Sequence, residues 1–367
     1  MKIGIDISQI IYEGTGVGNY TSHLVTYLSK SNDIELVLFG SSFGAFNKLQ
    51  NFVSNLTNSP NTKTKLYPLP ERLLNLLWNN IHFGSLEHFI GNVDIFHTSD
   101  WLEPPSRAKK VTTIHDLTVY KNPDLSHPYI VSTQKNKLRW VRKESDAIIT
   151  DSEATKTDII EILKIPEEKI TVIYPGVDER FKPQDKYFIQ DVKKKYNIKN
   201  NYLLCVGTQE PRKNIDKVIE SFKLLSEKDI ELVIVGKYGW GEKSKVLNNV
   251  HTLGFIPNED LPALYSGAKI FIYPSLDEGF GLPVLEAMAS GCPVIASEKG
   301  SLKEIINNAA IIIDPTSTSD LVSSIEILLK DNIKRDELID KGKKQSQKFN
   351  WNKTSSETLS LYTKLLE

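Results

Sequence analysis

The 367-residue chain has little cysteine: Cys205 and Cys292 are its two thiols, and both stand in apolar, strand-like stretches. Two cysteines in a chain of this length make neither a disulfide framework nor a cysteine-ligated zinc site. We therefore expect both thiols to be buried in the core of a protein that resides in a reducing compartment.

Net charge and long apolar runs are also lacking. The 45 Lys and Arg residues nearly balance the 46 Asp and Glu residues, which disfavours a nucleic-acid protein that relies on bulk positive charge. No apolar run approaches the roughly 18 residues that a membrane span needs, and no secretory segment precedes the first expected strand at residues 2–7. We expect a cytoplasmic protein, with peripheral contact to the inner face of a membrane left open.

Short apolar runs alternate with helical patterns along both halves of the chain. Strands are predicted at residues 2–7, 34–39, 93–97, 111–115, 147–150 and 170–174, and again at 202–206, 231–235, 250–253, 269–273, 293–296 and 310–313. Helical periodicity marks residues 18–30, 72–90, 130–144 and 153–163 in the first half. This alternation predicts an α/β protein with two Rossmann-like, doubly wound parallel sheets, because single cores rarely exceed ~250–300 residues.

A stretch rich in proline and glycine, residues 175–183, separates the two halves. We place the domain boundary there, which gives an N-terminal domain at 1–183 and a C-terminal domain at 184–350. Residues 351–367 then predict a terminal amphipathic helix.

The turn after the strand at 269–273 combines backbone donors with carboxylates. Gly279 and Gly281 let a ligand approach the backbone closely, and Pro283 suits the first residue of a helix whose free N–H groups favour an anion. Glu278 and Glu286 add carboxylates that can accept hydrogen bonds from sugar hydroxyls. Either glutamate alone would more often be an ordinary surface residue, but the whole turn suits a ligand with hydroxyls and phosphate.

A second turn carries the adjacent cations Arg212 and Lys213 between a strand and a helix. An arginine fork and a lysine point charge there are typical of a phosphate site, and the alternative is an exposed basic turn.

In the first half, Gly14, Gly16 and Gly18 suggest a glycine-rich loop over a ligand. A dinucleotide-binding fingerprint fits poorly, because residues 8–13 separate these glycines from the strand. His115 ends a strand, where ligands of such sheets bind, although a lone histidine is more often structural. The stretch at 96–101 likewise ends a strand and could line an acceptor side, and the alternative is a structural loop.

The string Glu278-Gly-Phe-Gly-Leu-Pro ending at Glu286, together with the Arg212-Lys213 turn, resembles the donor site of retaining glycosyltransferases of the GT-B fold, family four (glycosyl transferases group 1). The sequence Gly-Thr-x-Glu-Pro-Arg-Lys-Asn at 207–214 resembles the variant of family members that use GDP-mannose. The resemblance implies a mannosyltransferase of polysaccharide biosynthesis that moves a hexose from a nucleotide sugar to a hydroxyl of a glycan or lipid-linked acceptor.

The resemblance also implies roles for individual residues. The catalytic set is Arg212, Lys213, Glu278 and His115, with His115 facing the donor sugar. The donor-binding set is Gly16, Gly18, Gly207, Phe255, Ile256, Gly279, Phe280, Gly281, Leu282 and Glu286, with the backbone of Phe255 and Ile256 at the nucleobase and Glu286 at the ribose. In this family the anomeric configuration is retained and the last helix, 351–367, packs back on the N-terminal domain.

The sequence contains no Asp-x-Asp pair of the kind that holds a metal-bound nucleotide. Because cations can neutralise the leaving diphosphate instead, we expect no metal and no cofactor. The alternatives are a UDP-sugar-dependent enzyme of the same fold, a sugar-nucleotide epimerase or phosphorylase, a two-lobed solute-binding protein and a nicotinamide oxidoreductase.

Overall fold

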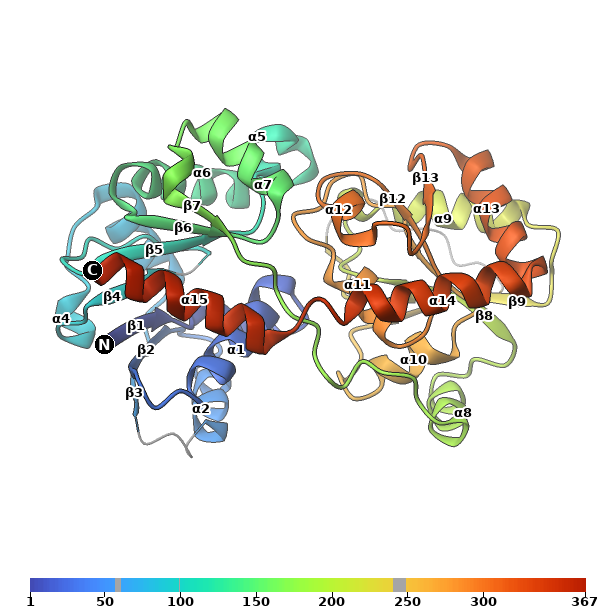
Figure 1. Ribbon diagram of the computed structural model, residues 1–367, viewed down its shortest axis with the longest axis horizontal. Coiled ribbons are helices and arrows are strands. Elements are labelled where there is room, and N and C mark those ends of the chain that lie inside the picture. The colour runs from blue at the N-terminus through green and yellow to red at the C-terminus, as the bar shows by residue number, and fades with distance from the viewer. Residues whose placement is uncertain (57–60, 99, 240–248) are drawn as a thin grey trace. The chain divides into compact units, whose positions relative to one another are not determined.

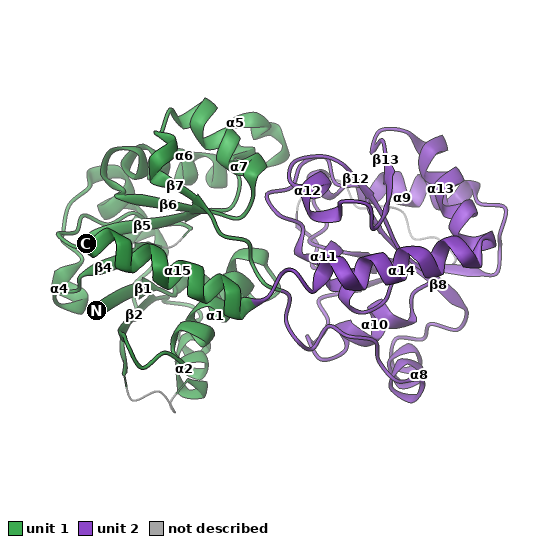
Figure 2. Cartoon of the chain, viewed as in Figure 1, with its two compact units in different colours: residues 1–176, 351–367 green, residues 177–350 purple. Residues whose placement is uncertain are grey.

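The computed structural model describes residues 1–56, 61–98, 100–239 and 249–367, and these form two compact units (Figure 2). Unit 1 comprises residues 1–176 and 351–367, and unit 2 comprises residues 177–350. Each unit is built on one parallel sheet flanked by helices (Figure 1). The predicted fold class, two doubly wound parallel-sheet domains, is confirmed. Within the described residues, no helix is both long and apolar enough to cross a bilayer.

The sheet of unit 1 has the strand order β3-β2-β1-β4-β5-β6-β7, with all neighbours parallel. Its strands are β1 (Lys2–Asp6), β2 (Glu35–Ser41), β3 (Thr62–Tyr67), β4 (Ile95–Thr98), β5 (Lys109–Ile114), β6 (Ala147–Thr150) and β7 (Ile170–Val172). The outermost strand β3 was not predicted. Its first four residues alternate threonine with lysine. Because the side chains of an edge strand are exposed, β3 lacks the continuous apolar run that marks a central parallel strand.

Helices cover both faces of this sheet, because successive side chains of a strand point to opposite sides. Ile3 and Ile5 pack with α1 (Gly16–Leu28), α2 (Phe46–Asn55) and α15 (Trp351–Leu366). On the other face, Val37 and Phe39 pack against Trp78 and α4 (Glu87–Ile90). The helices α6 (Pro128–Glu144) and α7 (Glu153–Asp158) lie on this same face, toward β5 and β6.

The helix expected over residues 72–90 is interrupted. It consists of α3 (Glu71–Leu74), a π-helical segment η2 (Asn75–Ile81) and α4. His82 ends η2 with a left-handed backbone, φ 58°, which no continuous α-helix contains. Its ring is held by Trp78 O at 2.7 Å and Glu144 Oε1 at 2.8 Å. These tertiary contacts therefore interrupt the segment, although its hydrophobic periodicity alone predicts one continuous helix.

The C-terminal helix α15 belongs to unit 1. Trp351 and Tyr362 are buried in the core below β1 and α1, and Tyr362 Oη lies 2.6 Å from His97 Nδ1. Thr354 Oγ1 donates to Tyr174 O at 2.7 Å. Burial lowers the pKa of His97 to about 3, so its ring is neutral and structural.

Removing the Tyr362 side chain should destabilise unit 1. Tyr362→Ala leaves a large cavity and removes one of the two hydrogen-bond partners of His97, the other being Thr113, so we expect the free energy of unfolding to fall by about 3–5 kcal/mol. Urea denaturation followed by circular dichroism measures this loss. The matched control is Tyr187→Ala, which removes a tyrosine ring that is 86% exposed and should change stability by less than about 0.5 kcal/mol. Equal stabilities for the two variants would contradict the packing of α15.

The sheet of unit 2 has the order β10-β9-β8-β11-β12-β13. Its strands are β8 (Asn201–Val206), β9 (Ile230–Val235), β10 (Val250–Gly254), β11 (Ile270–Tyr273), β12 (Val294–Ser297) and β13 (Ile311–Ile313). Its helices include α8 (Lys186–Lys195), α9 (Ile215–Leu224), α10 (Leu261–Gly267), α11 (Leu282–Ala289), α12 (Leu302–Ile306), α13 (Thr318–Lys330) and α14 (Asn332–Ser346). Both cysteines are buried free thiols in this unit, as predicted.

The unit boundary falls at Gly176/Val177 rather than near residue 183. The segment that was expected to link the domains packs on unit 2: Val177 N donates to Phe349 O at 3.1 Å, and the Phe181 ring meets the Tyr265 ring edge-on at 5.8 Å. Proline and glycine mark the chain's departure from unit 1, but these contacts assign the segment itself to unit 2.

Candidate functional site

The two turns singled out in the second half lie side by side. Because β8 and β11 are neighbours in a parallel sheet, the turns that leave their carboxyl ends meet at one edge. The first turn ends in a short 3-10 helix, η6 (Pro211–Lys213), and the second leads into α11. A backbone hydrogen bond from Leu276 N to Arg212 O, 2.9 Å long, joins them. Residues that are 65 positions apart in the sequence therefore share one site.

A buried carboxylate lies between two cations at this edge. Glu278 is 7% exposed; its Oε1 lies 2.6 Å from Lys213 Nζ and its Oε2 3.1 Å from Arg212 Nη1. Lys213 Nζ also donates to Tyr273 Oη at 2.7 Å. Glu210 adds a second carboxylate, with its Oε1 3.0 Å from Arg212 Nη2, so the cluster holds two cations and two carboxylates.

The charges of this cluster shift one another's pKa values. Burial alone would raise the pKa of Glu278, but Arg212 and Lys213 lower it to about 2. Burial lowers the pKa of Lys213, and the attraction of Glu278 opposes that shift. Glu278 is therefore a carboxylate at neutral pH, an acceptor rather than a donor of hydrogen bonds.

Other contacts fix the guanidinium of Arg212. Its Nη2 donates to Glu210 Oε1 at 3.0 Å, and Nη1 donates to Asp277 O at 3.0 Å. Asn214, next in the chain, is left-handed with φ 56° and donates from Nδ2 to Pro315 O at 2.7 Å. These bonds hold the cationic turn in place before any ligand arrives, which is how electrostatic stabilisation avoids a reorganisation cost.

The turn into α11 needs glycine. Gly281 is left-handed with φ 104°, and a Cβ there would lie 2.5 Å from Leu302 Cδ2. Across the turn, a Cβ on Gly300 would lie 2.1 Å from Glu278 O, and Ser301 Oγ donates to Phe280 O at 2.8 Å. Gly300 and Ser301 were missed by the sequence analysis, because they lie after β12 and only the fold brings them against Glu278.

The remaining predicted donor residues line the same turn or its neighbours. Gly279 and Phe280 precede Gly281, and Leu282 is the first residue of α11. The Phe280 side chain is buried against Phe349, with ring centroids 5.8 Å apart, so only its backbone remains to meet a ligand.

Glu286 is a partly buried carboxyl group with an altered pKa. Its Oε2 accepts a hydrogen bond from Tyr265 Oη at 3.0 Å. Burial raises the pKa of Glu286 to about 7 despite that hydrogen bond. Near neutral pH this side chain is therefore divided between its neutral and charged forms.

We expect a nucleotide sugar to bind more weakly below pH 7. Hydroxyls of a bound ribose would donate to Glu286 and favour its charged form, so protonation at low pH opposes binding, approaching about tenfold in affinity per pH unit. His115 and Glu278, with pKa values of about 9 and about 2, keep their charge in this window. Calorimetric titration with GDP-mannose should show the trend in the parent protein and a flat profile in Glu286→Gln. If the affinity of Glu286→Gln for GDP-mannose still fell at low pH, a group other than Glu286 would cause the pH dependence.

Gly207, Phe255 and Ile256 stand at the ends of β8 and β10. Gly207 faces the Lys213 side chain, because a Cβ placed on Gly207 would lie 3.5 Å from Lys213 Cε. Ile256 is buried, whereas Phe255 is 45% exposed with Lys237 Nζ 4.8 Å above its ring. An exposed aromatic ring beside a cation offers a surface on which a planar base can stack.

The predicted residues of the first half lie in unit 1. His115 follows β5, and its Nδ1 lies 2.5 Å from Asp151 Oδ2. Burial would lower the pKa of His115, but Asp151 raises it to about 9, so the imidazolium is the form present at neutral pH. The Tyr20 ring meets the imidazole edge-on at 4.8 Å.

The glycine-rich segment is a helix start rather than an open loop. Gly16 is the first residue of α1, and Gly18 N donates to the N-cap side chain Thr15 Oγ1 at 3.2 Å. A Cβ on Gly16 would meet no heavy atom within 4 Å, so this position is open on one side. Gly16 therefore allows close approach to the N-terminus of α1, whereas a Cβ on Gly18 would lie 2.8 Å from Tyr12 O, so that glycine is needed for packing within unit 1.

Among the described residues, no group of three or more His, Cys, Asp or Glu side chains is placed to hold a metal ion.

The fold and the cationic strand-end site define a class of enzyme. Residues 14–181 match the family model Glycosyltransferase Family 4, and residues 188–345 match the model Glycosyl transferases group 1. The chain belongs to this family of glycosyltransferases and is a transferase.

Particular relatives are similar along most of its length. The chain is 29% identical over 389 aligned positions to O-antigen chain mannosyltransferase B of Escherichia coli, covering 99% of each chain. It is 30% identical over 337 positions to O-antigen chain mannosyltransferase RfbU of Salmonella typhimurium, covering 88% of this chain and 89% of the relative.

Solved structures share the fold at low identity. Sucrose-phosphate synthase of Thermosynechococcus elongatus superposes with a TM-score of 0.75 at 19% identity, covering 100% of this chain and 99% of the other. HepE of Anabaena, solved in complex with UDP and glucose, gives a TM-score of 0.74 at 17% identity, covering 99% of both chains.

Proposed function

We propose that this glycosyltransferase moves mannose from GDP-mannose to a hydroxyl of a glycan or lipid-linked acceptor, with retention of the anomeric configuration and without a metal ion. The Arg212–Lys213–Glu278 cluster at the carboxyl edge of the unit 2 sheet carries this proposal. Mannose and a polysaccharide product are favoured because the relatives with high coverage are O-antigen chain mannosyltransferases.

The chemical problem in this reaction is the negative charge that builds on the departing diphosphate. Arg212 and Lys213 are cations held by fixed partners, and the start of α11, which follows Glu278 in the same turn, has no side-chain cap. These groups would stabilise the leaving group in the role that a metal ion has in other sugar transferases. Glu278, ionised between them, would both position the cations and accept hydrogen bonds from the donor sugar.

His115 would act on the sugar rather than on the nucleotide. As an imidazolium its Nδ1 donates to Asp151, which leaves Nε2–H as a second donor for a sugar oxygen. No side chain is assigned as a covalent nucleophile. In the proposed reaction, the acceptor hydroxyl attacks the donor sugar from the same face that the diphosphate leaves.

A thermal-shift panel tests the donor. A ligand that binds only the folded state raises the melting temperature by mass action. We expect GDP-mannose and GDP to raise it in the presence of chelator, and UDP-glucose to have a smaller effect at equal concentration. A larger shift with UDP-glucose would favour the alternative, a UDP-sugar-dependent enzyme of the same fold, and a shift that needs magnesium would contradict metal independence.

A further inference from the structure

One segment of unit 1 exposes several large apolar side chains close together. Leu73 of α3, Leu76 and Ile81 of η2, and Phe83 shortly after η2 are 41, 49, 60 and 71% exposed. Single exposed apolar residues are common on soluble proteins, but four large ones within 11 residues of the chain form a surface whose contact with water is unfavourable. We call these four side chains the apolar patch.

The fold holds the apolar patch at the surface. The opposite side of the same segment is buried, because Leu74 and Trp78 belong to a core cluster of unit 1. His82 ends η2 with its left-handed backbone, and its ring stacks on the Trp140 ring with 3.6 Å between the centroids. These contacts fix the inner side of the segment, so the four apolar side chains remain exposed.

A row of cations on α6 adjoins the apolar patch. Four exposed cations lie on one face of this helix, because they are spaced by about one and two helical turns: Lys135, Arg139, Arg142 and Lys143. Two hydrogen bonds join α6 to η2. Asn136 Nδ2 donates to Asn80 Oδ1 at 2.9 Å, and Trp140 Nε1 donates to Asn79 O at 2.8 Å. The cations of α6 therefore border the apolar patch.

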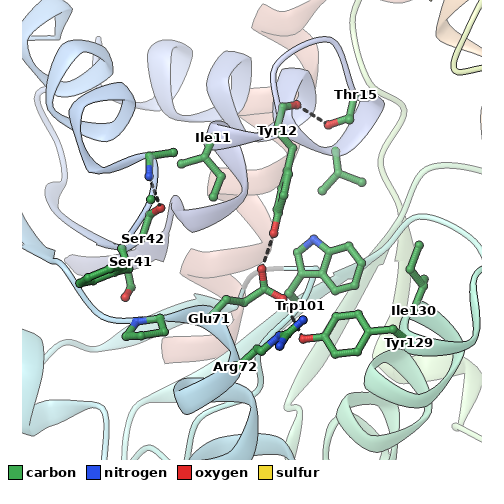
Figure 3. A pocket seen from close by; sticks show the side chains of 15 residues that line it. Ile11, Tyr12, Thr15, Ser41, Ser42, Glu71, Arg72, Trp101, Tyr129 and Ile130 are labelled. Carbon is green, nitrogen blue, oxygen red and sulfur yellow. Dashed lines mark hydrogen bonds between the residues drawn. The ribbon is translucent and has the colours of Figure 1, made fainter. Parts of the chain in front are cut away.

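The charge beside the apolar patch is opposite in sign to that of the whole chain, whose net charge is -1. Glu144, at the end of α6, lies 2.7 Å from Lys110 Nζ and is thereby paired. At the start of α3, Glu71 accepts a hydrogen bond from Tyr12 Oη, and its charge cancels that of Arg72 (Figure 3). The four exposed cations of α6 thus give this face a positive charge.

We infer that the apolar patch and the cations of α6 dock unit 1 on the surface of an anionic lipid bilayer. The apolar side chains enter the boundary between headgroups and acyl chains, and the cations meet lipid phosphates. Trp140, half-buried between the two, is a residue type that favours this depth. A row of like charges along one helix favours a partner of uniform negative charge over a protein surface of mixed charge. This inference goes beyond the proposed reaction and does not depend on the sugar donor.

Vesicle co-sedimentation without donor or acceptor tests this docking. The parent protein should sediment with vesicles of phosphatidylglycerol and phosphatidylcholine, more weakly with phosphatidylcholine alone, and more weakly as salt screens the cations. Ile81→Ser/Phe83→Ser removes two inserted side chains and should lower the partition coefficient about tenfold or more. Arg142→Gln/Lys143→Gln removes two cations, each worth about fivefold in binding near an anionic surface, and should have a similar effect.

The matched control is Tyr187→Ser/Ile333→Ser in unit 2. It removes two apolar side chains that are 86 and 84% exposed and should bind vesicles like the parent. All these variants alter exposed residues, so thermal melting should show the parent's stability.

Three results would overturn the docking surface. They are a parent protein that does not bind the mixed vesicles, equal binding by the parent and Ile81→Ser/Phe83→Ser, and equal binding to both kinds of vesicle. A dimer of the parent that Ile81→Ser/Phe83→Ser dissociates, without any vesicle binding, would assign the apolar patch to contact between copies of the chain instead.

Discussion

Arg212→Ala should lower kcat for transfer from GDP-mannose by about 10²–10³-fold, equivalent to about 2.7–4 kcal/mol of lost transition-state stabilisation. The guanidinium is fixed by Glu210 and by the backbone of Asp277, so in the proposed reaction it would meet the leaving diphosphate without having to reorganise. The variant should fold normally, because Glu278 keeps its ion pair with Lys213 at 2.6 Å. GDP release under saturating donor and acceptor measures the rate.

Two further variants sharpen this measurement. Arg212→Lys keeps a cation but loses the fork, so it should recover only part of the rate. Arg107→Ala removes an exposed arginine of unit 1 and should leave the rate unchanged. A rate for Arg212→Ala within about threefold of the parent enzyme would remove the cationic turn from the mechanism.

Glu278 needs a gentler substitution than alanine. Alanine would leave Arg212 and Lys213 beside each other without their shared carboxylate, and stranding buried charges costs about 3–5 kcal/mol of stability. Glutamine also removes the charge, but its amide oxygen can still accept a hydrogen bond from Lys213, so Glu278→Gln should lose less stability than Glu278→Ala. A loss of activity in Glu278→Gln at a temperature at which the variant stays folded separates chemistry from folding.

His115→Ala should lower transfer by about 10²-fold while leaving GDP binding near that of the parent. The imidazolium donor is held by Asp151 and is proposed to contact the sugar, which GDP lacks. Calorimetric titration with GDP, set beside the transfer rate of the same preparation, distinguishes a contact to the sugar from one to the nucleotide.

An exposed histidine supplies the control for that experiment. His88→Ala removes a surface imidazole of α4 and should change neither readout. Equal losses of GDP binding and of transfer in His115→Ala would place His115 at the nucleotide or in the fold rather than at the sugar.

The sheets and the strand-end turns could be predicted from the sequence because each is encoded locally. The apolar runs of central parallel strands are continuous, and the turns at Arg212 and Glu278 carry rare combinations of glycine, proline and charge. Their contact follows from a fold rule, since neighbouring parallel strands end at one edge. The ion pair between Lys213 and Glu278 is then a consequence of strand order rather than of spacing.

Other features depend on tertiary packing and could not be predicted in this way. The edge strand β3 has no apolar run, and the break at His82 is held by Trp78 and Glu144 from a distance. A cavity of unit 1 gathers residues from separate segments, of which the sequence singled out the strand end that contains Trp101 (Figure 3). Similarly, the pKa of Glu286 depends on its burial beside Tyr265, which periodicity does not reveal.

The central claim is that cationic side chains, rather than a metal, activate GDP-mannose for transfer with retention. Its most direct test is the NMR spectrum of the product formed from GDP-mannose and a methyl α-mannobioside, used as the acceptor, in excess chelator. We predict a new α-mannosidic linkage, formed by the parent enzyme at an undiminished rate and strongly reduced with Arg212→Ala. A β-linkage, or a product that appears only after magnesium or manganese is added, would contradict it.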